Sequence, residues 1–173
     1  MRGSASKGFA AVLFVVACAF ALLANYWVGS SLMGNMADRD FMSLWAGGKA
    51  ILLGLDPNDH RVWPQLRAQY GSTWNPEPIC LYPLWTLLVC IPIALMPFHV
   101  AVSVWMTASE LALPISILLL LLMMRHQRAR WMVLSALVGG LTFRPFIASL
   151  TSGQIAPFLL LMLAGAITLY AQK

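Results

Sequence analysis

Two aspartates in the segment Asp38-Arg39-Asp40 are the residues best suited by type and spacing to carry chemistry. A positioned carboxylate can act as a general base toward a hydroxyl group, and an Asp-x-Asp pair can hold a divalent cation beside a phosphate. The structural alternative is that Asp40 is the N-cap of a helix that follows it. The sequence identifies no metal site and no certain cofactor, and a divalent cation at this pair stays open.

Two further charged residues lie inside apolar runs, where an unpaired charge is costly. Glu110 comes fifteen residues before Arg125, and Arg144 comes fourteen residues after Arg130. At about 1.5 Å per residue, both lie about 21–22 Å from the same end of neighbouring antiparallel helices, so we predict that they pair. One interpretation is a structural ion pair. The other is that Arg144 binds a phosphate, which guanidinium groups contact in bidentate fashion.

The composition indicates that these residues belong to a membrane protein. Of the 173 residues, 60% are hydrophobic and 10% are charged, which leaves too little polar surface for a soluble domain. The formal net charge of +5 comes from short basic groups between apolar runs, so no continuous basic stripe is available to bind nucleic acid. The three cysteines give no disulfide framework.

Four apolar runs predict membrane-spanning helices within one membrane domain, residues 1–173. They cover about residues 9–30, 98–124, 131–150 and 155–171. Basic residues mark the cytoplasmic side, so the N-terminus, the basic segment 125–130 and the C-terminus are expected on that side of a multi-pass protein. For the first run, a signal peptide cleaved near Ala17-Cys18-Ala19 is the alternative.

Residues 34–97 then form an outer loop that contains interfacial helices. Residues 40–54 predict an amphipathic helix on the membrane surface, with Asp40 as its N-cap and Gly54 as its C-terminal stop. Residues 81–97 are interpreted as an interfacial or re-entrant helix, since a crossing there would reverse the orientation of the basic segment; five spans are the alternative. The aromatic residues of the loop are interpreted as interfacial anchors, with stacking on a sugar as the alternative: Trp63, Tyr70 and Trp74.

Several short motifs follow one another in a distinctive order, namely Asp40-Phe41, Leu53-Gly54-Leu55-Asp56-Pro57, Tyr82-Pro83-Leu84-Trp85, Pro92-Ile93-Ala94-Leu95-Met96-Pro97, Trp105 and Gly153-Gln154. This order resembles the N-terminal part of the GT-C membrane glycosyltransferases of glycosyltransferase family 87. The resemblance covers most of this chain, which corresponds to only about the first half of a typical family member. The sequence departs from the family's usual motifs at Leu84, Asn58 and Ala156.

The resemblance implies an all-α integral membrane fold of the GT-C type, truncated, with about four transmembrane helices and juxtamembrane helices in the first outer loop. It also implies transfer of a hexosyl, mannosyl or arabinosyl group from a polyprenyl-phosphate donor to a lipid or glycan acceptor. The reaction would take place at the outer face of a bacterial inner membrane, among membrane lipids. Two alternatives stay open for a chain of this length: a glycosyltransferase in itself, or an incomplete fragment that needs a C-terminal half or a partner chain.

The resemblance also assigns roles to individual residues. Asp40 matches the general base that accepts the proton of the acceptor hydroxyl. Tyr82 and Gln154 lie in the matching motifs and are expected to bind the donor or substrate, although Gln154 also suits a helix cap. Asp38 and Arg144 are candidates for the same role because of their charge and position, not because of the resemblance. The alternative function is a non-enzymatic membrane protein, such as a small transporter subunit or an assembly factor, in which Asp40 is only a cap.

Overall fold

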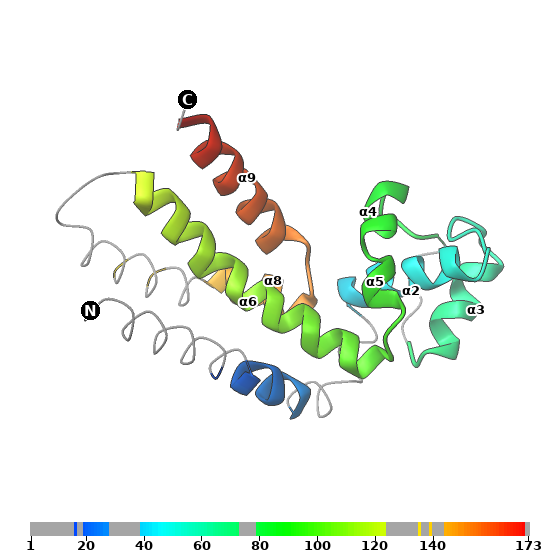
Figure 1. Cartoon of the computed structure of the whole chain (residues 1–173). Helices are drawn as coiled ribbons and strands as arrows, with labels where there is room; N and C mark the ends of the chain where they lie inside the picture. Colours follow the sequence, from blue (N-terminus) through cyan, green and yellow to red (C-terminus); the bar gives the residue numbers. More distant parts are fainter. Residues whose placement is uncertain are drawn as a thin grey trace.

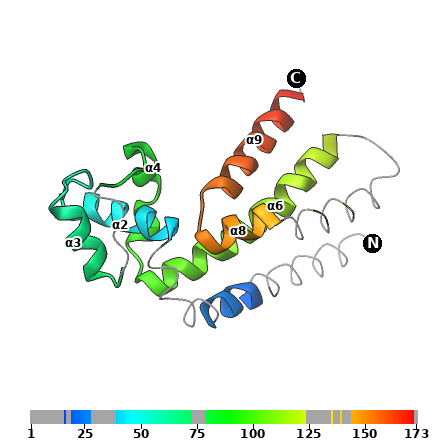
Figure 2. The same ribbon diagram turned by 180° about the vertical axis from the view of Figure 1, so that it is seen from behind.

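The computed structural model describes residues 16, 19–27, 39–72, 79–123, 135, 139 and 144–171, which form helices and connecting segments without a strand (Figure 1). One group consists of four short helices: α2 (Asp40–Leu52), α3 (Val62–Gln69), α4 (Leu84–Val89) and α5 (Ile91–Ala94). The other part contains α6 (Phe98–Met123), α8 (Arg144–Ser152) and α9 (Ala156–Ala171). Helix α6 packs against α9, and both run away from the α2–α5 group (Figures 1 and 2). The all-α class is thus confirmed for the described residues.

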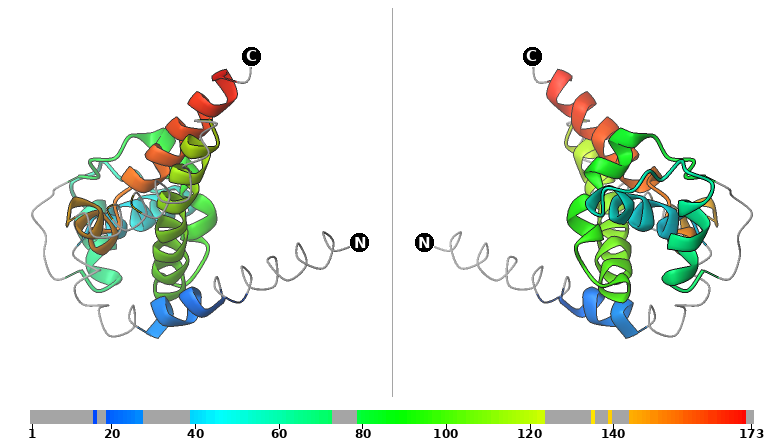
Figure 3. Two further views of the ribbon diagram at one scale, coloured as in Figure 1. Left: turned by 90° about the vertical axis from the view of Figure 1, so that its left-hand side faces the viewer. Right: turned by 90° about the vertical axis from the view of Figure 1, so that its right-hand side faces the viewer.

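One helix among the described residues is long and apolar enough to cross a membrane, Phe98–Leu120 within α6. Helix α9 is also apolar but has 16 residues. The spans predicted at 98–124 and 155–171 therefore coincide with helices, which Figure 3 shows from two sides. The spans predicted at 9–30 and 131–150 lie largely outside the described residues. A total of four spans stays a prediction.

Helix α2 is not the amphipathic surface helix that the sequence predicts. A helix that lies on a membrane surface keeps one face in water, but α2 has buried residues on all of its faces. They are Phe41, Met42, Ser43, Leu44, Trp45, Ala46, Gly47, Gly48 and Ala50. The physical reason is a stretch of small residues in its middle. A Cβ atom on Gly47 would stand 2.6 Å from Cδ2 of Leu87, and one on Gly48 would stand 2.9 Å from Cβ of Ala94. Because these two positions are glycines, α4 and α5 can pack directly onto the α2 backbone.

The two ends of α2 differ in how well the sequence predicts them. At the start, Arg39 occupies the N-cap position without a side-chain capping bond, so the prediction of Asp40 as N-cap is wrong. At the end, Gly54 has a φ of 68° and its N–H donates to the Ile51 carbonyl. The N–H of Leu55 donates to the carbonyl of Ala50, which completes a Schellman motif and confirms Gly54 as the stop.

Trp63 is a core residue of the α2–α5 group. Its side chain is 0% exposed, so its interpretation as an interfacial anchor is wrong. Tyr70 packs edge-on against Trp45 with ring centroids 4.7 Å apart. Trp74 lies outside the described residues. These contacts hold α3 against α2, because large rings bury more apolar surface against a helix than they would in the headgroup region.

The segment 81–97 contains two short helices and no crossing helix. Helix α4 has six residues and α5 has four. Even end to end they would reach about 15 Å, half of the ~30 Å hydrocarbon core of a bilayer. The buried side chains of this segment are Thr86, Leu87, Cys90 and Ala94. Of these, Leu87 and Ala94 lie against the glycines of α2. The geometry agrees with an interfacial or re-entrant segment and not with a fifth span.

Candidate active site

Asp40, the predicted general base, is the first residue of α2 and is partly buried. Within the described residues its carboxylate has no hydrogen-bond or salt-bridge partner. The carboxylates of Asp56 and Asp59, in contrast, each accept a backbone N–H two residues further on, from Asn58 and Arg61, at 2.8 Å. Asp56 and Asp59 therefore stabilise turns. Asp40 keeps its oxygen atoms available for a substrate proton.

The next residue, Phe41, packs against Gly153 in the turn between α8 and α9. A Cβ atom on Gly153 would stand 2.4 Å from Cβ and 3.3 Å from Cα of Phe41, so only glycine allows this approach. Gly153 also has a φ of 69°, a conformation that favours glycine. Two motifs that lie more than a hundred residues apart in the sequence, Asp40-Phe41 and Gly153-Gln154, are thus brought together.

Trp105 of α6 holds the two motifs in contact. Its indole N–H donates to the Gly153 carbonyl at 3.0 Å in a buried position. Its ring lies 5.4 Å from the ring of Phe41 and 4.6 Å from that of Phe158, measured between centroids. The sequence contains Trp105 as a motif residue, but nothing in its spacing predicts this positioning role, because the contact depends on three separate helices.

Gln154 is exposed at the end of this turn. The backbone N–H groups of Gly153 and Gln154 donate to the carbonyls of Leu150 and Ser149, which forms a second Schellman motif. The hydroxyl of Ser149 donates to the side-chain oxygen of Gln154 at 3.0 Å. This bond leaves the side-chain amide nitrogen of Gln154 as a donor to a ligand. The Cα atoms of Gln154 and Asp40 lie within about 12 Å, given the Gly153–Phe41 contact and a spacing of about 3.8 Å between successive Cα atoms.

For the other predicted site residues, the position relative to Asp40 and Gln154 is defined less closely. Tyr82 is partly buried against the same core cluster, two residues after Cys80, whose thiol faces the carbonyl of Ser43 at 3.9 Å. Arg144 begins α8, and the length of that helix puts its backbone about 13 Å from Gly153. The side chain of Arg144 lies outside the described part of the chain. So does Asp38, and the Asp-x-Asp pair keeps the status of a prediction.

Glu110 has a partner that the sequence analysis missed. The side-chain amide of Asn25, which is 6% exposed, donates to Oε2 of Glu110 at 2.9 Å and to Oγ1 of Thr107 at 3.0 Å. The sequence does contain a sign of this contact, because Asn25 is a polar residue within the first apolar run. These bonds attach the helical segment 19–27 to α6. The predicted pairing of Glu110 with Arg144 stays a prediction.

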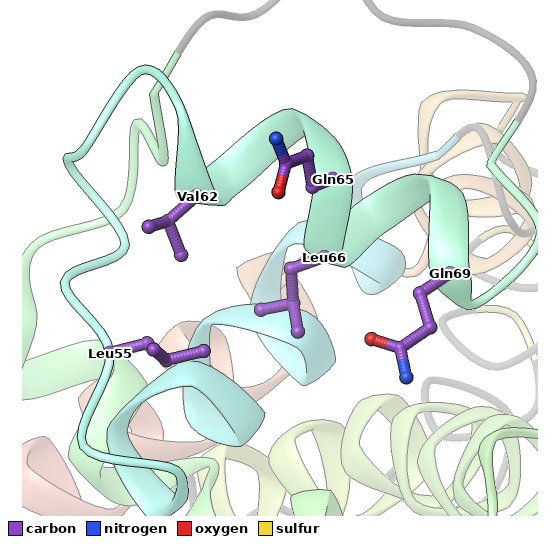
Figure 4. Close-up of a pocket in the computed structure, with 5 residues that line it drawn as sticks. All are labelled: Leu55, Val62, Gln65, Leu66 and Gln69. Atoms are coloured by element: carbon purple, nitrogen blue, oxygen red, sulfur yellow. The ribbon is translucent and has the colours of Figure 1, made fainter.

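A shallow hollow of about 200 Å³ lies away from these residues, between α3 and the loop after α2 (Figure 4). It is lined by Leu55, Val62, Gln65, Leu66 and Gln69. Leu55 follows the C-terminal end of α2, whereas Asp40 is at its start, about 20 Å away along the helix axis. We therefore place the candidate site at the start of α2, where Asp40 and Gln154 approach each other, and not in this hollow.

The fold and site define an all-α, membrane-associated protein with a carboxylate and a carboxamide near one end of its membrane helix. A family model, glycosyltransferase family 87, matches residues 81–173, more than half of the chain, and the chain belongs to that family. The resemblance stated from the motifs is thereby confirmed, and with it glycosyltransferase activity in general terms. The matched segment contains Tyr82, Trp105, Arg144 and Gln154 but not Asp40. No curated protein and no solved structure matches the chain.

Proposed function

We propose that this protein transfers a sugar from a polyprenyl-phosphate donor to a hydroxyl of a lipid or glycan acceptor, with Asp40 as general base. The observation that carries the proposal is the docking of Gly153 on Phe41, because it puts the Cα atoms of Asp40, whose carboxylate is unengaged, and of exposed Gln154 within about 12 Å of each other. Family membership supports the reaction class. Family membership does not specify the donor, the acceptor or the residue roles, which are part of this proposal.

The reaction needs one base and no acid. Asp40 accepts the proton of the acceptor hydroxyl as its oxygen forms a bond to the anomeric carbon. The bond from the anomeric carbon to the phosphate oxygen breaks, and the phosphate leaves with the electron pair. A phosphate leaving group needs no protonation, in contrast to the leaving group of a glycoside hydrolase. A single displacement inverts the configuration at the anomeric carbon.

Gln154 is suited to orient the sugar. Its side-chain oxygen is held by Ser149, so the amide nitrogen points a fixed donor toward a hydroxyl or phosphate oxygen. Arg144 and Tyr82 are proposed to contact the donor, Arg144 through its phosphate. Asp38 is the second candidate for the base or, with Asp40, for a divalent cation.

The proposed location is a bacterial inner membrane with the site at the outer face. Helix α6 supplies a span, and the α2–α5 group with Asp40 lies at its Phe98 end. The opposite end of α6 precedes the basic segment 125–130, which favours the cytoplasmic side. A multi-pass arrangement with a cytoplasmic N-terminus follows from the same rule.

A donor panel tests this proposal. Purified protein in detergent is given radiolabelled sugars on polyprenyl phosphate or on nucleoside diphosphate, together with a membrane lipid extract as acceptor. We expect transfer from polyprenyl-phosphate sugars only, with an inverted product, and an increased donor KM in Gln154→Ala. Transfer from nucleotide sugars would contradict the donor class. Absence of both transfer and donor binding would favour the non-enzymatic alternative.

A further inference from the structure

Helix α4 carries an apolar face that no described residue covers. Its large side chains on that face, and those at its approach, are 49–70% exposed: Leu81, Leu84, Trp85, Leu88 and Val89. They recur at the spacing of one helix face, opposite the buried side that contacts α2. Figures 1 and 2 show α4 projecting from the α2–α5 group with no described helix on its outer side. An apolar surface of this kind marks an interaction site.

The position of α4 relative to α6 argues for lipid as the partner of this face. Residues 81–98 contain no charged residue, and three residues, 95–97, connect α5 to the helix that is long enough to span a membrane. A protein interface carries a polar rim with hydrogen bonds. Here the exposed face is uniformly apolar apart from the indole of Trp85, which suits the boundary between headgroups and acyl chains.

The connection between α5 and α6 is also fixed by α2. The indole N–H of Trp45 donates to the Met96 carbonyl at 3.2 Å, and Nζ of Lys49 donates to the Ala94 carbonyl at 3.3 Å. The α4 face consequently has a set position beside the Phe98 end of α6. The contact of Leu87 with Gly47 holds α4 itself against α2, so that its outer face points away from α2.

Lys49 supplies a second, independent observation. Its ammonium group is partly buried, lies 5.7 Å from the ring centroid of Trp45 and donates to one neutral carbonyl. An ammonium group has three N–H donors, so within the described residues two of them lack a partner, and the charge has no carboxylate beside it. Leu95, next to Ala94, is 66% exposed. A phosphate at this point would complete the coordination of Lys49.

We propose that the outer face of α4 together with Lys49 is a docking surface for an anionic phospholipid of the bilayer. The acyl chains cover the α4 face, and the headgroup phosphate accepts hydrogen bonds from Lys49. This lipid holds the α2–α5 group, and with it the start of α2, at a fixed height relative to the membrane.

The headgroup contact is tested by native mass spectrometry of the full chain released from detergent with phosphatidylglycerol or phosphatidylcholine. The wild type retains phosphatidylglycerol preferentially, and Lys49→Gln reduces that retention about fivefold. Arg61→Gln, which removes an exposed cation before α3, leaves it unchanged. Equal retention by Lys49→Gln and the wild type overturns the headgroup contact. Displacement of phosphatidylglycerol by polyprenyl phosphate at Lys49 overturns it as well, because it assigns Lys49 to the donor.

The apolar contact is tested by fluorescence in nanodiscs. A single cysteine at Trp85→Cys carries an environment-sensitive dye, with Leu53→Cys as the matched exposed control and Cys18 replaced by serine. Cys80 and Cys90 are buried, and burial raises the pKa of the Cys90 thiol to about 11, so neither competes for the dye. Nitroxide on the lipid acyl chains quenches the dye at position 85 and not at position 53. Quenching at 85 by aqueous iodide alone overturns the proposal.

Discussion

Two parts of the molecule satisfy their apolar side chains in different ways. The α2–α5 group buries α2 on every side against protein, through glycines that admit neighbouring helices at close range. Helix α9 instead leaves many of its large apolar side chains exposed, namely Leu159, Leu160, Met162, Leu163, Ile167, Leu169 and Tyr170. The first part resembles the core of a soluble protein, whereas the second exposes an apolar surface of the kind that we expect to contact lipid. The candidate site lies where they meet, at the contact of Phe41 with Gly153.

The largest effect is expected at that contact. Gly153→Ala places a Cβ atom 2.4 Å from Cβ of Phe41 at a φ of 69°. We expect a loss of about 2–4 kcal/mol of stability from the strained backbone and the overlap together, and loss of sugar transfer. Thermal unfolding in detergent and the transfer rate measure the two effects.

Gly54→Ala is the matched control for Gly153→Ala. Gly54 has nearly the same φ, 68°, and also ends a helix in a Schellman motif, but nothing lies within 4 Å of its added Cβ. Its expected cost is about 1–2 kcal/mol, from the left-handed backbone alone, with transfer retained. Equal costs for the two substitutions would mean that the Phe41 contact does not join the two parts.

The second effect concerns Trp105, whose N–H bond to Gly153 spans the two parts. Trp105→Phe leaves a buried carbonyl without a donor, at a cost of about 1–2 kcal/mol, and should lower transfer because Gln154 is no longer held. Trp45→Phe removes a comparable bond, to Met96, inside the α2–α5 group. It should lower stability by a similar amount with little change in transfer. A similar drop in transfer for both variants would remove the positioning role of Trp105.

Much of this arrangement follows from the sequence, and the reasons for the failures are physical. Helix α6 and the stop at Gly54 were predictable because a long apolar run and a positive-φ glycine act locally. The burial of Trp63 and of both faces of α2 could not be predicted. Glycine is neither clearly polar nor clearly apolar, and close helix packing depends on segments that are distant in the sequence. Asp40 was found from its motif. Its approach to Gln154 could not be predicted, because it depends on the contact of Phe41 with Gly153.

A third, smaller effect tests the packing inside the α2–α5 group. Gly48→Ala would place its Cβ atom 2.9 Å from that of Ala94 and 3.4 Å from the Cys90 carbonyl oxygen, neither of which can move freely. We expect a loss of about 1 kcal/mol, after allowing for the better helix propensity of alanine. Gly47→Ala faces the end of the Leu87 side chain, which can rotate, and should be close to neutral in the same unfolding assay. The reverse order would show that α5 is not packed as described.

The smallest effect is expected at the contact between the helical segment 19–27 and α6. Glu110→Gln keeps an oxygen that can accept the Asn25 bond, so stability should fall by less than about 1 kcal/mol. If Glu110 were the buried ionic partner of Arg144, removing one charge should cost about 3–5 kcal/mol. The unfolding midpoint of Glu110→Gln therefore also shows whether the predicted Glu110–Arg144 ion pair is formed. Asn25→Ala, which removes both hydrogen bonds that this amide donates, should cost more than Glu110→Gln.

Asp40 is proposed as the base of a site formed at the junction of the two parts. This role is tested most directly by the transfer rate of Asp40→Asn beside Asp56→Asn, with folding checked by thermal unfolding. Asp40→Asn should lower kcat by about 10²–10⁴-fold, with an unfolding temperature close to that of the wild type. Asp56→Asn, whose carboxylate accepts a turn hydrogen bond, should retain transfer. A folded Asp40→Asn protein that transfers sugar at the wild-type rate would show that Asp40 is not the base.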